Sequence, residues 1–212
     1  MVPHLGARQG DFDSIYSVED QSWPTQVANR LFLRTMVLRF LETLRHSEKE
    51  DIRSGLDVGC GPGRYLVEFL RQGKTRVVGL DMADGMLSIA SKALTEFDEA
   101  RWALICGDYL ETDVGEKFDS ACLMGLLDYV EEPIKLFEKL REEVTREIYA
   151  SFPRRGGLLA WQREVRYRRR RCPLYLYSES DVKSILDAAG MAGQYEMQDF
   201  GRDIYVRVVL RP

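Results

Sequence analysis

The sequence predicts a single α/β domain built on a mostly parallel β-sheet. Its 212 residues suit one domain. From Gly55 onward, short apolar runs alternate with stretches of helical periodicity, which is typical of parallel strands connected by helices. The end of the chain differs, because two strand-like runs flank Gly201-Arg202-Asp203 and predict a terminal hairpin.

The first element predicted is a long helix that starts at Pro24 and ends in the charged stretch 47–53. Apolar residues recur there at intervals of three to four positions, which predicts one buried helical face. The residues of that face are Val27, Leu31, Leu33, Met36, Val37, Phe40, Leu41 and Leu44.

Strands and helices then alternate as far as Pro153. Gly73 ends the first of these helices, and Pro133 stands at a first-turn position that tolerates proline. The predicted strands are residues 55–58, 76–80, 102–106, 118–124 and 147–152, and the predicted helices are residues 64–71, 85–97 and 133–142.

After an irregular and very basic segment, 154–174, a helix is predicted from Ser178 to Gly190. The two strands of the terminal hairpin are predicted at 194–200 and 204–210.

Composition and cysteine usage exclude several classes of protein. A net charge of −4 argues against a protein whose whole surface binds nucleic acid. No signal peptide or long uncharged apolar stretch is visible, so we expect a cytoplasmic protein. The histidines, His4 and His46, lie outside the motifs, and no pair of cysteines has the CxxC spacing, so we expect reduced thiols and no metal site. The cysteines are Cys60, Cys106, Cys122 and Cys172.

A glycine-rich loop, Asp57-Val58-Gly59-Cys60-Gly61-Pro62-Gly63, lies between the first strand of the sheet and the helix after it. Glycine permits a tight turn and lets a ligand approach the backbone closely. The helix N-terminus behind the loop offers free N–H groups. A glycine loop alone occurs in many proteins, so its neighbours decide what it indicates.

Acidic residues follow the next two strands, with Asp81 after the second and Asp108 after the third. Ligands of open α/β sheets bind at this carboxyl edge, and a carboxylate there can accept hydrogen bonds from both hydroxyls of a ribose. The glycine spacing is GxGxG and not the GxGxxG of dinucleotide sites, and the acids are unfavourable for a pyrophosphate. A cationic nucleoside such as S-adenosylmethionine fits better.

The motifs LDVGCGPGR, VVGLDMADGML, ICGDYLE and FDSACLMGLLDYV resemble those of class I S-adenosylmethionine-dependent methyltransferases, in order and in spacing. The resemblance covers Gly55 to the C-terminus. It implies a Rossmann-like, seven-stranded, mostly parallel sheet with an antiparallel last strand and helices on both faces. Residues 51–212 would then bind S-adenosyl-L-methionine, and residues 1–50 would form an N-terminal helical lid or extension.

The resemblance also implies a role for each rim residue. Asp57 and the loop would contact the methionine part of the cofactor, Asp81 the ribose, and Met82 and Asp108 the adenine. Met124 and Gly125 would line the sulfonium and the mouth of the substrate site. The complete expected set is Asp57, Gly59, Cys60, Gly61, Gly63, Asp81, Met82, Gly107, Asp108, Tyr109, Met124 and Gly125. Structural alternatives stay open, because the two methionines also suit the core and Asp108 also suits a turn cap.

Three residues are candidates for a catalytic base or for positioning the acceptor. Asp128 and Tyr129 follow the fourth strand, in a stretch that lacks the Asn-Pro-Pro-aromatic motif used for DNA adenine or glutamine. A capping Asp and a packed Tyr are the simpler explanation of these two residues. Tyr16 is the third, since related enzymes bring a tyrosine from an N-terminal segment that covers the cofactor; plain packing is its alternative.

The stretch from Arg163 to Arg171 carries six arginines in nine residues. A solvated face is the simplest interpretation. Clustered guanidinium groups also suit a carboxylate or phosphate, which makes Arg166, Arg169 and Arg170 candidate substrate ligands. Arginines with Tyr167, Tyr175 and Tyr177 could alternatively bind RNA.

The segment SFPRR…CPLYLYS…AAG resembles the tails of small-molecule methyltransferases near the magnesium-protoporphyrin and quinone groups. The leading hypothesis is therefore methylation of a small-molecule acceptor at oxygen, and the arginine stretch suits an anionic one. The rivals are an RNA or protein methyltransferase that docks through the arginines, and a non-catalytic S-adenosylmethionine-binding partner protein. A nicotinamide-dependent oxidoreductase is disfavoured by the glycine spacing.

Overall fold

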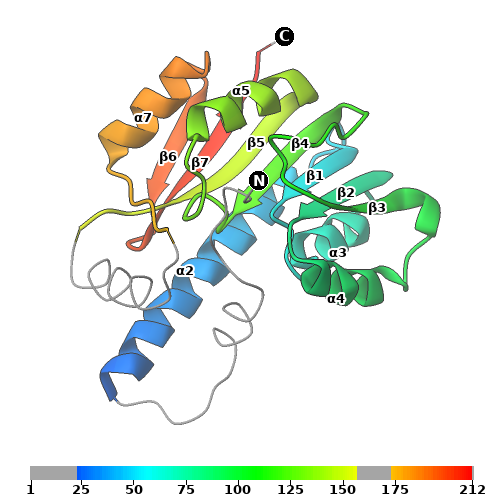
Figure 1. The fold of residues 1–212 in the computed structure, drawn as a ribbon, viewed down its shortest axis with the longest axis horizontal. Coiled ribbons are helices and arrows are strands. Elements are labelled where there is room, and N and C mark those ends of the chain that lie inside the picture. Colours follow the sequence, from blue (N-terminus) through cyan, green and yellow to red (C-terminus); the bar gives the residue numbers. More distant parts are fainter. Residues whose placement is uncertain (1–22, 157–172, 212) are drawn as a thin grey trace.

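The computed structural model describes residues 23–156 and 173–211. Within these residues, seven strands form one sheet in the order β3-β2-β1-β4-β5-β7-β6 (Figure 1). The strands are β1 (Ser54–Val58), β2 (Arg76–Asp81), β3 (Trp102–Cys106), β4 (Phe118–Met124), β5 (Val144–Pro153), β6 (Tyr195–Asp199) and β7 (Asp203–Val209).

Strand directions agree with the predicted fold. Strands β3, β2, β1, β4 and β5 pair in parallel. Strand β7 is antiparallel to both of its neighbours, β5 and β6. The prediction of a mostly parallel sheet with an antiparallel last strand is confirmed, and the terminal hairpin supplies that strand.

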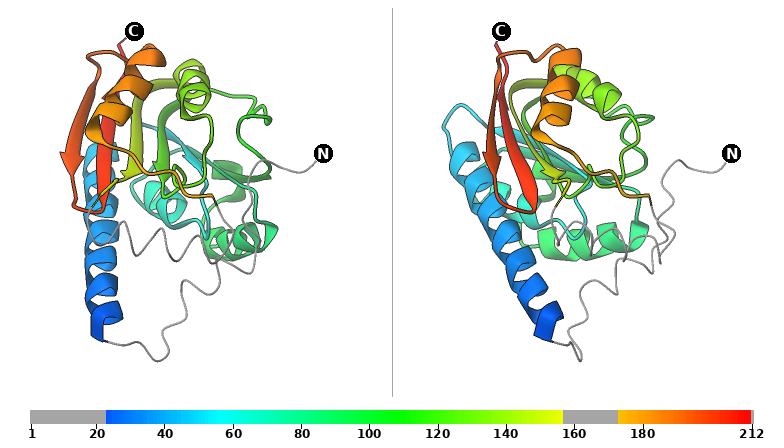
Figure 2. Two further views of the ribbon diagram at one scale, coloured as in Figure 1. Left: turned by 60° about the vertical axis from the view of Figure 1, so that its left-hand side comes forward. Right: turned by 90° about the vertical axis from the view of Figure 1, so that its left-hand side faces the viewer.

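Helices cover both faces of the sheet (Figures 1 and 2). On one face, α2 (Trp23–Ser47) contacts α3 (Arg64–Arg71), and α3 contacts α4 (Asp84–Leu94). On the other face, α5 (Pro133–Glu143) contacts α7 (Glu179–Ala188). A short 3-10 turn, η1 (Glu99–Arg101), precedes β3. Among the described helices, none combines the length and apolar character needed to span a bilayer.

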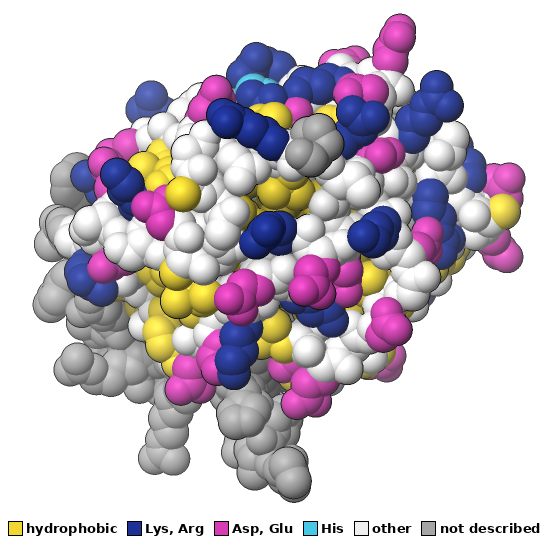
Figure 3. All heavy atoms as spheres, turned by 90° about the horizontal axis from the view of Figure 1, so that it is seen from above, with side chains coloured by type: hydrophobic (Ala, Val, Ile, Leu, Met, Phe, Trp, Pro, Cys, Tyr) yellow, Lys and Arg dark blue, Asp and Glu magenta, His cyan; other side chains and the backbone are white. Residues whose placement is uncertain are grey.

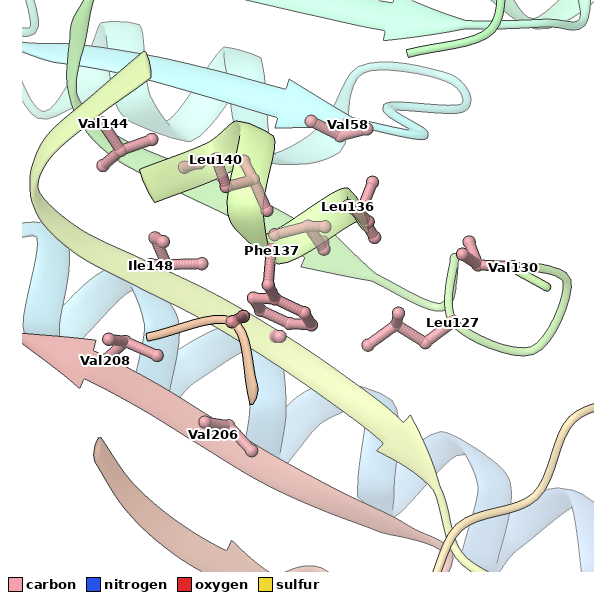
Figure 4. Packing of buried hydrophobic residues seen from close by; sticks show 14 of the residues in the cluster. Val58, Leu127, Val130, Leu136, Phe137, Leu140, Val144, Ile148, Val206 and Val208 are labelled. Carbon is pink, nitrogen blue, oxygen red and sulfur yellow. The ribbon is translucent and has the colours of Figure 1, made fainter. Parts of the chain in front are cut away.

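The larger of two apolar cores lies between the sheet and helices α5 and α7. Phe137 is fully buried there and stacks on Phe152 of β5, with ring centroids 5.7 Å apart. Figure 4 shows Phe137 and Leu140 of α5 packed over Ile148 of β5. The smaller core lies under α3 and α4, where Leu66 is fully buried. These cores hold the sheet rigid beneath its carboxyl edge.

The buried face predicted for the long helix is wrong in part. Val37 and Leu41 are 53% and 57% exposed, whereas Thr35 and Thr43 are 3% and 0% exposed. The hydroxyl of Thr35 donates to the Phe200 carbonyl, and that of Thr43 lies 3.3 Å from the Tyr205 hydroxyl of β7. The helix therefore meets polar groups at the ends of the strands, and these polar contacts override its hydrophobic pattern.

The other differences concern element ends. Strand β5 begins at Val144, three residues before the predicted start, because Val144 pairs with Phe118 across an irregularity in the register. Helix α4 ends at Leu94 and not at Phe97, and the Thr95 hydroxyl donates back to the Lys92 carbonyl there.

Candidate cofactor site

The parallel order brings the carboxyl ends of β1, β2, β3 and β4 to one edge of the sheet. Asp81 ends β2 and lies opposite Cys106, which ends β3. Asp57 of β1 lies between Gly79 of β2 and Cys122 of β4 in the register. The predicted ligand-binding residues of these strands therefore share one rim.

The glycine loop follows β1 with three positive φ angles, 73° at Gly59, 51° at Gly61 and 78° at Gly63. A side chain is excluded at Gly63 because its Cβ would lie 3.0 Å from the Cβ of Ala90 in α4. Gly61 is different, since no described atom lies within 4 Å of the place where a Cβ would stand. The loop thus packs on α4 at one end and borders open space at Gly61.

Asp81 links this loop to the start of α4. Its Oδ2 accepts from the Gly61 N–H at 2.8 Å, and its Oδ1 accepts from the Ala83 N–H at 2.8 Å. A carboxylate has about four acceptor positions, so two neutral donors leave capacity for further donors such as sugar hydroxyls. The fold therefore holds Asp81 in a fixed orientation beside the open space at Gly61.

Asp57 is 1% exposed, and its Oδ2 has no hydrogen-bond partner among the described residues. Burial, assisted by the nearby charge of Asp81, raises the pKa of the Asp57 carboxyl to about 7, although a hydrogen bond with Cys122 acts in the opposite direction. An unpaired carboxylate in this position is costly unless a donor or a cation approaches it. The rim therefore fits a ligand that carries an ammonium or sulfonium group, as S-adenosylmethionine does.

Residues 56–146 match the family model described as "Methyltransferase domain". The match covers less than half of the chain and includes the glycine loop and strands β2, β3 and β4. A search of curated protein sequences finds no match to the chain.

Solved structures share the fold. Magnesium protoporphyrin IX methyltransferase from Synechocystis PCC 6803, with bound SAH, superposes with a TM-score of 0.68 at 18% identity, over 95% of this chain and 94% of that chain. A protein of Nostoc punctiforme PCC 73102 assigned as an O-methyltransferase gives 0.69 at 14% identity, over 87% and 59%. The pyocyanin biosynthetic protein PhzM gives 0.65 at 21%, over 83% and 55%.

These identities are too low to carry more than the fold. Together with the matched family, the fold confirms the predicted resemblance to class I S-adenosylmethionine-dependent methyltransferases. The prediction of a methyltransferase agrees with the matched family, and a neighbour solved with bound SAM shares the fold. The roles of individual residues stay predictions.

Two residues predicted beside the adenine have structural partners within the matched region. The Asp108 Oδ1 accepts from the Leu110 N–H at 2.9 Å, which is the turn-cap geometry of the alternative interpretation. Tyr109 is 3% exposed, and its hydroxyl donates to Glu143 of α5. The Tyr109 ring is therefore engaged in the core, whereas Met82 and Gly107 are half-buried at the rim.

Past β4, the fold places Met124 and Gly125 at the neighbouring end of the sheet, both half-buried. Their surroundings include Arg39, which sequence reasoning missed. The Arg39 Nη1 donates to Ser151 Oγ at 3.2 Å and to Asp203 Oδ2 at 3.0 Å. No local pattern could have revealed these contacts, because Arg39 lies 112 and 164 residues away from its partners.

The candidate catalytic residues lie beside this end of the sheet. Asp128 is 3% exposed, and its carbonyl accepts from the Tyr175 N–H. Tyr129 is half-buried, and its N–H donates to the Leu126 carbonyl. Tyr16 lies outside the described residues. The buried carboxyl of Asp128 makes Tyr129 the more accessible of the two described candidates.

The arginines proposed as substrate ligands, Arg166, Arg169 and Arg170, also lie outside the described residues. Two tyrosines considered with them are described. Tyr177 is 7% exposed, and its hydroxyl donates to the Leu127 carbonyl at 3.3 Å. Tyr175 is half-buried and packs against the larger core. The proposal that Tyr177 offers a stacking surface for RNA is therefore wrong, because its ring packs edge-on against Phe152.

Proposed function

We propose that this protein transfers the methyl group of S-adenosylmethionine to an oxygen atom of a small-molecule acceptor. The observation that carries the proposal is the buried Asp57 carboxyl, whose Oδ2 lacks a partner among the described residues, beneath a loop that is open at Gly61. This arrangement suits a cationic nucleoside and is unfavourable for a diphosphate.

S-adenosylmethionine supplies a methyl group that its sulfonium already activates, so the protein's task is mainly alignment and the exclusion of water. Asp81 would accept from the ribose hydroxyls, and Asp57 would face the cationic amino-acid part. The turn at Gly125 would form the wall on the acceptor side, where in-line displacement requires the acceptor oxygen opposite the sulfur.

A small acceptor is supported by the structural neighbours, which include a magnesium protoporphyrin IX methyltransferase, a pyocyanin biosynthetic protein and a protein assigned as an O-methyltransferase. Methylation at oxygen needs at most one group to orient or deprotonate the acceptor hydroxyl. Tyr129 is the described residue that we assign to this role, because Asp128 is buried. An anionic acceptor would meet Arg166, Arg169 or Arg170.

The division of the chain also belongs to this proposal. Residues 51–212 would form the cofactor-binding domain, and residues 1–50 an extension over its carboxyl edge. The described part of α2 supports an intimate association, because Thr35, Arg39 and Thr43 all bond to groups of the sheet or of its connecting loops. Figure 2 shows that the N-terminal part of α2 continues beyond the strands.

An RNA methyltransferase is the strongest rival, and the observation that favours it is the run of arginines from Arg163 to Arg171. Against it, basic and acidic side chains are interspersed on the face drawn in Figure 3. A polyanion usually selects a continuous basic surface. A non-catalytic binder would take up the cofactor and show no turnover.

The test is methyl transfer from S-adenosylmethionine with a radiolabelled methyl group. The full chain is incubated with a panel of hydroxylated aromatic carboxylic acids and porphyrin carboxylates, and separately with total RNA. We expect label in a small product and none in RNA. Label in RNA that disappears at high salt would establish the rival, and cofactor binding with no labelled product in either arm would establish the non-catalytic binder.

A further inference from the structure

Arg39 connects three elements that are distant in the sequence. Its Nη1 donates to Ser151 Oγ in β5 and to Asp203 Oδ2 at the start of β7, at 3.2 and 3.0 Å. The side chains of the ion pair are only 12% and 9% exposed. Because desolvation of both charges offsets much of their attraction, the main consequence of such shielding is that removing one partner is strongly destabilising.

Ser151 connects Arg39 to the turn after β4. Its hydroxyl oxygen also accepts from the Gly125 N–H, at 3.1 Å. Ser151 is 1% exposed, so water does not compete for these bonds. Gly125 has a φ of 84°, and a Cβ there would lie 3.4 Å from the Arg39 Nη2. The guanidinium thus lies directly behind the turn and is bonded to the acceptor of its N–H.

The Gly125 turn also borders the glycine loop. A Cβ on Gly59 would lie 3.1 Å from the side chain of Leu126, the residue that follows Gly125. Strands β1 and β4 are neighbours, with Asp57 opposite Cys122. A displacement of the Gly125 turn would therefore move a wall of the same rim that holds Asp57.

We propose that Arg39 is a positioning residue for methyl transfer, and that it acts through Ser151 on the backbone of Gly125. The inference rests on the function proposed above. Without the guanidinium, the Ser151 hydroxyl loses one of its two donors and can rotate away from Gly125. Alignment of reacting groups is sensitive to displacements of about 1 Å, so a loosened turn lowers the rate without contact between Arg39 and the acceptor.

The experiment compares five full-length proteins with the wild type. Arg39→Met removes the charge, Arg39→Lys restores it, Ser151→Ala removes the relay, and one protein combines Arg39→Met with Ser151→Ala. Arg45→Met is the matched control, because Arg45 lies on the same helix and pairs with Glu42 at a site where its side chain is 64% exposed. The readouts are hydrogen exchange of the Gly125 amide by nuclear magnetic resonance and calorimetric affinity for S-adenosylhomocysteine.

We expect Arg39→Met to speed Gly125 exchange by about tenfold and to weaken S-adenosylhomocysteine by about fivefold, as the loss of one hydrogen bond predicts. Arg39→Lys should recover part of both, and Arg45→Met should change neither. Once Ser151→Ala is present, Arg39→Met should add nothing to Gly125 exchange.

Unchanged Gly125 exchange in Arg39→Met, or additive effects in the double variant, would overturn the relay. Should Arg39→Met fail to fold, Ser151→Ala and Arg39→Lys decide the same question. Failure of the wild type to bind S-adenosylhomocysteine would instead overturn the proposed function, whatever Gly125 does. The two failures are therefore distinguishable.

Discussion

The two halves of the sheet's carboxyl edge differ in whether their buried polar groups have hydrogen-bond partners among the described residues. At the ends of β1 and β2, Asp57 has a buried oxygen without a partner among the described residues, and Gly61 borders open space. At the ends of β4 and β5 and the start of β7, Arg39 donates to both Ser151 and Asp203. The first half leaves polar capacity for the ligand that we propose, so we call it the ligand-requiring half. The polar groups of the second half bond within the chain, so we call it the completed half.

Removing Arg39 from the completed half should give the largest effect, and this effect is on the stability of the fold. Arg39→Met removes an ion-pair partner of the shielded Asp203 carboxylate, and we expect a loss of about 3 kcal/mol in the free energy of unfolding. Urea denaturation measures it. Arg45→Met, at an exposed ion pair of the same helix, should have little effect. Equal losses in the two variants would show that the contacts of Arg39 with Ser151 and Asp203 stabilise the fold no more than a surface ion pair does.

The ligand-requiring half should respond in binding. Asp81→Ala removes the acceptor that we assign to the ribose hydroxyls, and we expect the cofactor to bind about 1–3 kcal/mol more weakly. Calorimetry with S-adenosylhomocysteine measures this, with Asp84→Ala as the control because Asp84 is an exposed residue of the adjoining helix. An unchanged affinity for Asp81→Ala would remove Asp81 from the site.

The affinity for the cofactor should depend on pH through Asp57. Burial raises the pKa of this carboxyl to about 7, and a cationic ligand favours its ionised form. The affinity should therefore rise roughly tenfold between pH 6 and pH 8, with release of a proton. Asp57→Asn should abolish that rise, and a wild-type affinity that is flat over this range would contradict the placement of the cation.

In the unliganded protein, ionisation of the Asp57 carboxyl lowers the stability of the fold, whereas it raises the affinity for the cofactor. Its pKa is higher in the folded chain than the ordinary value of 3.8, so its contribution to stability is fully present below that value and is lost as the pH rises through about 7. Denaturation of the unliganded protein across this range measures the loss, and Asp57→Asn should reduce it.

The smallest effect should separate backbone strain from ligand contact. Gly61→Ala and Gly73→Ala each place a methyl group at a positive φ where no described atom lies within 4 Å, so each should cost about 1 kcal/mol of stability. Only Gly61 lies at the rim, since Gly73 precedes β2 at the opposite edge. S-adenosylhomocysteine should bind more weakly to Gly61→Ala alone, and equal affinities for the two variants would mean that the open space is not the ligand's.

Local signals predicted the ligand-requiring half. Helix α3 and strands β3 and β4 have the predicted bounds, because Gly73 stops the helix at a φ of 86° and apolar runs set the strands. Ser178 forms the expected helix cap, as a reciprocal pair with Asp181. The rim acids follow from the rule that parallel strands end at one edge.

The completed half could not be predicted in this way. Its bonds join residues more than a hundred positions apart, and Arg39 has no motif around it. The exposed Val37 and Leu41 show that the helical pattern pointed to the wrong face, because polar contacts at Thr35 and Thr43 set the orientation of α2. Tertiary packing also sets the burial of Tyr177. The sequence alone allowed it to be a surface residue, whereas the structure buries it.

The most direct test of the central claim is a calorimetric titration of the wild-type chain with S-adenosylhomocysteine and, separately, with NADH. A rim built around the Asp57 carboxyl, whose Oδ2 has no partner among the described residues, predicts saturable binding of the nucleoside and no heat from the dinucleotide. Binding of NADH with no uptake of S-adenosylhomocysteine would contradict it.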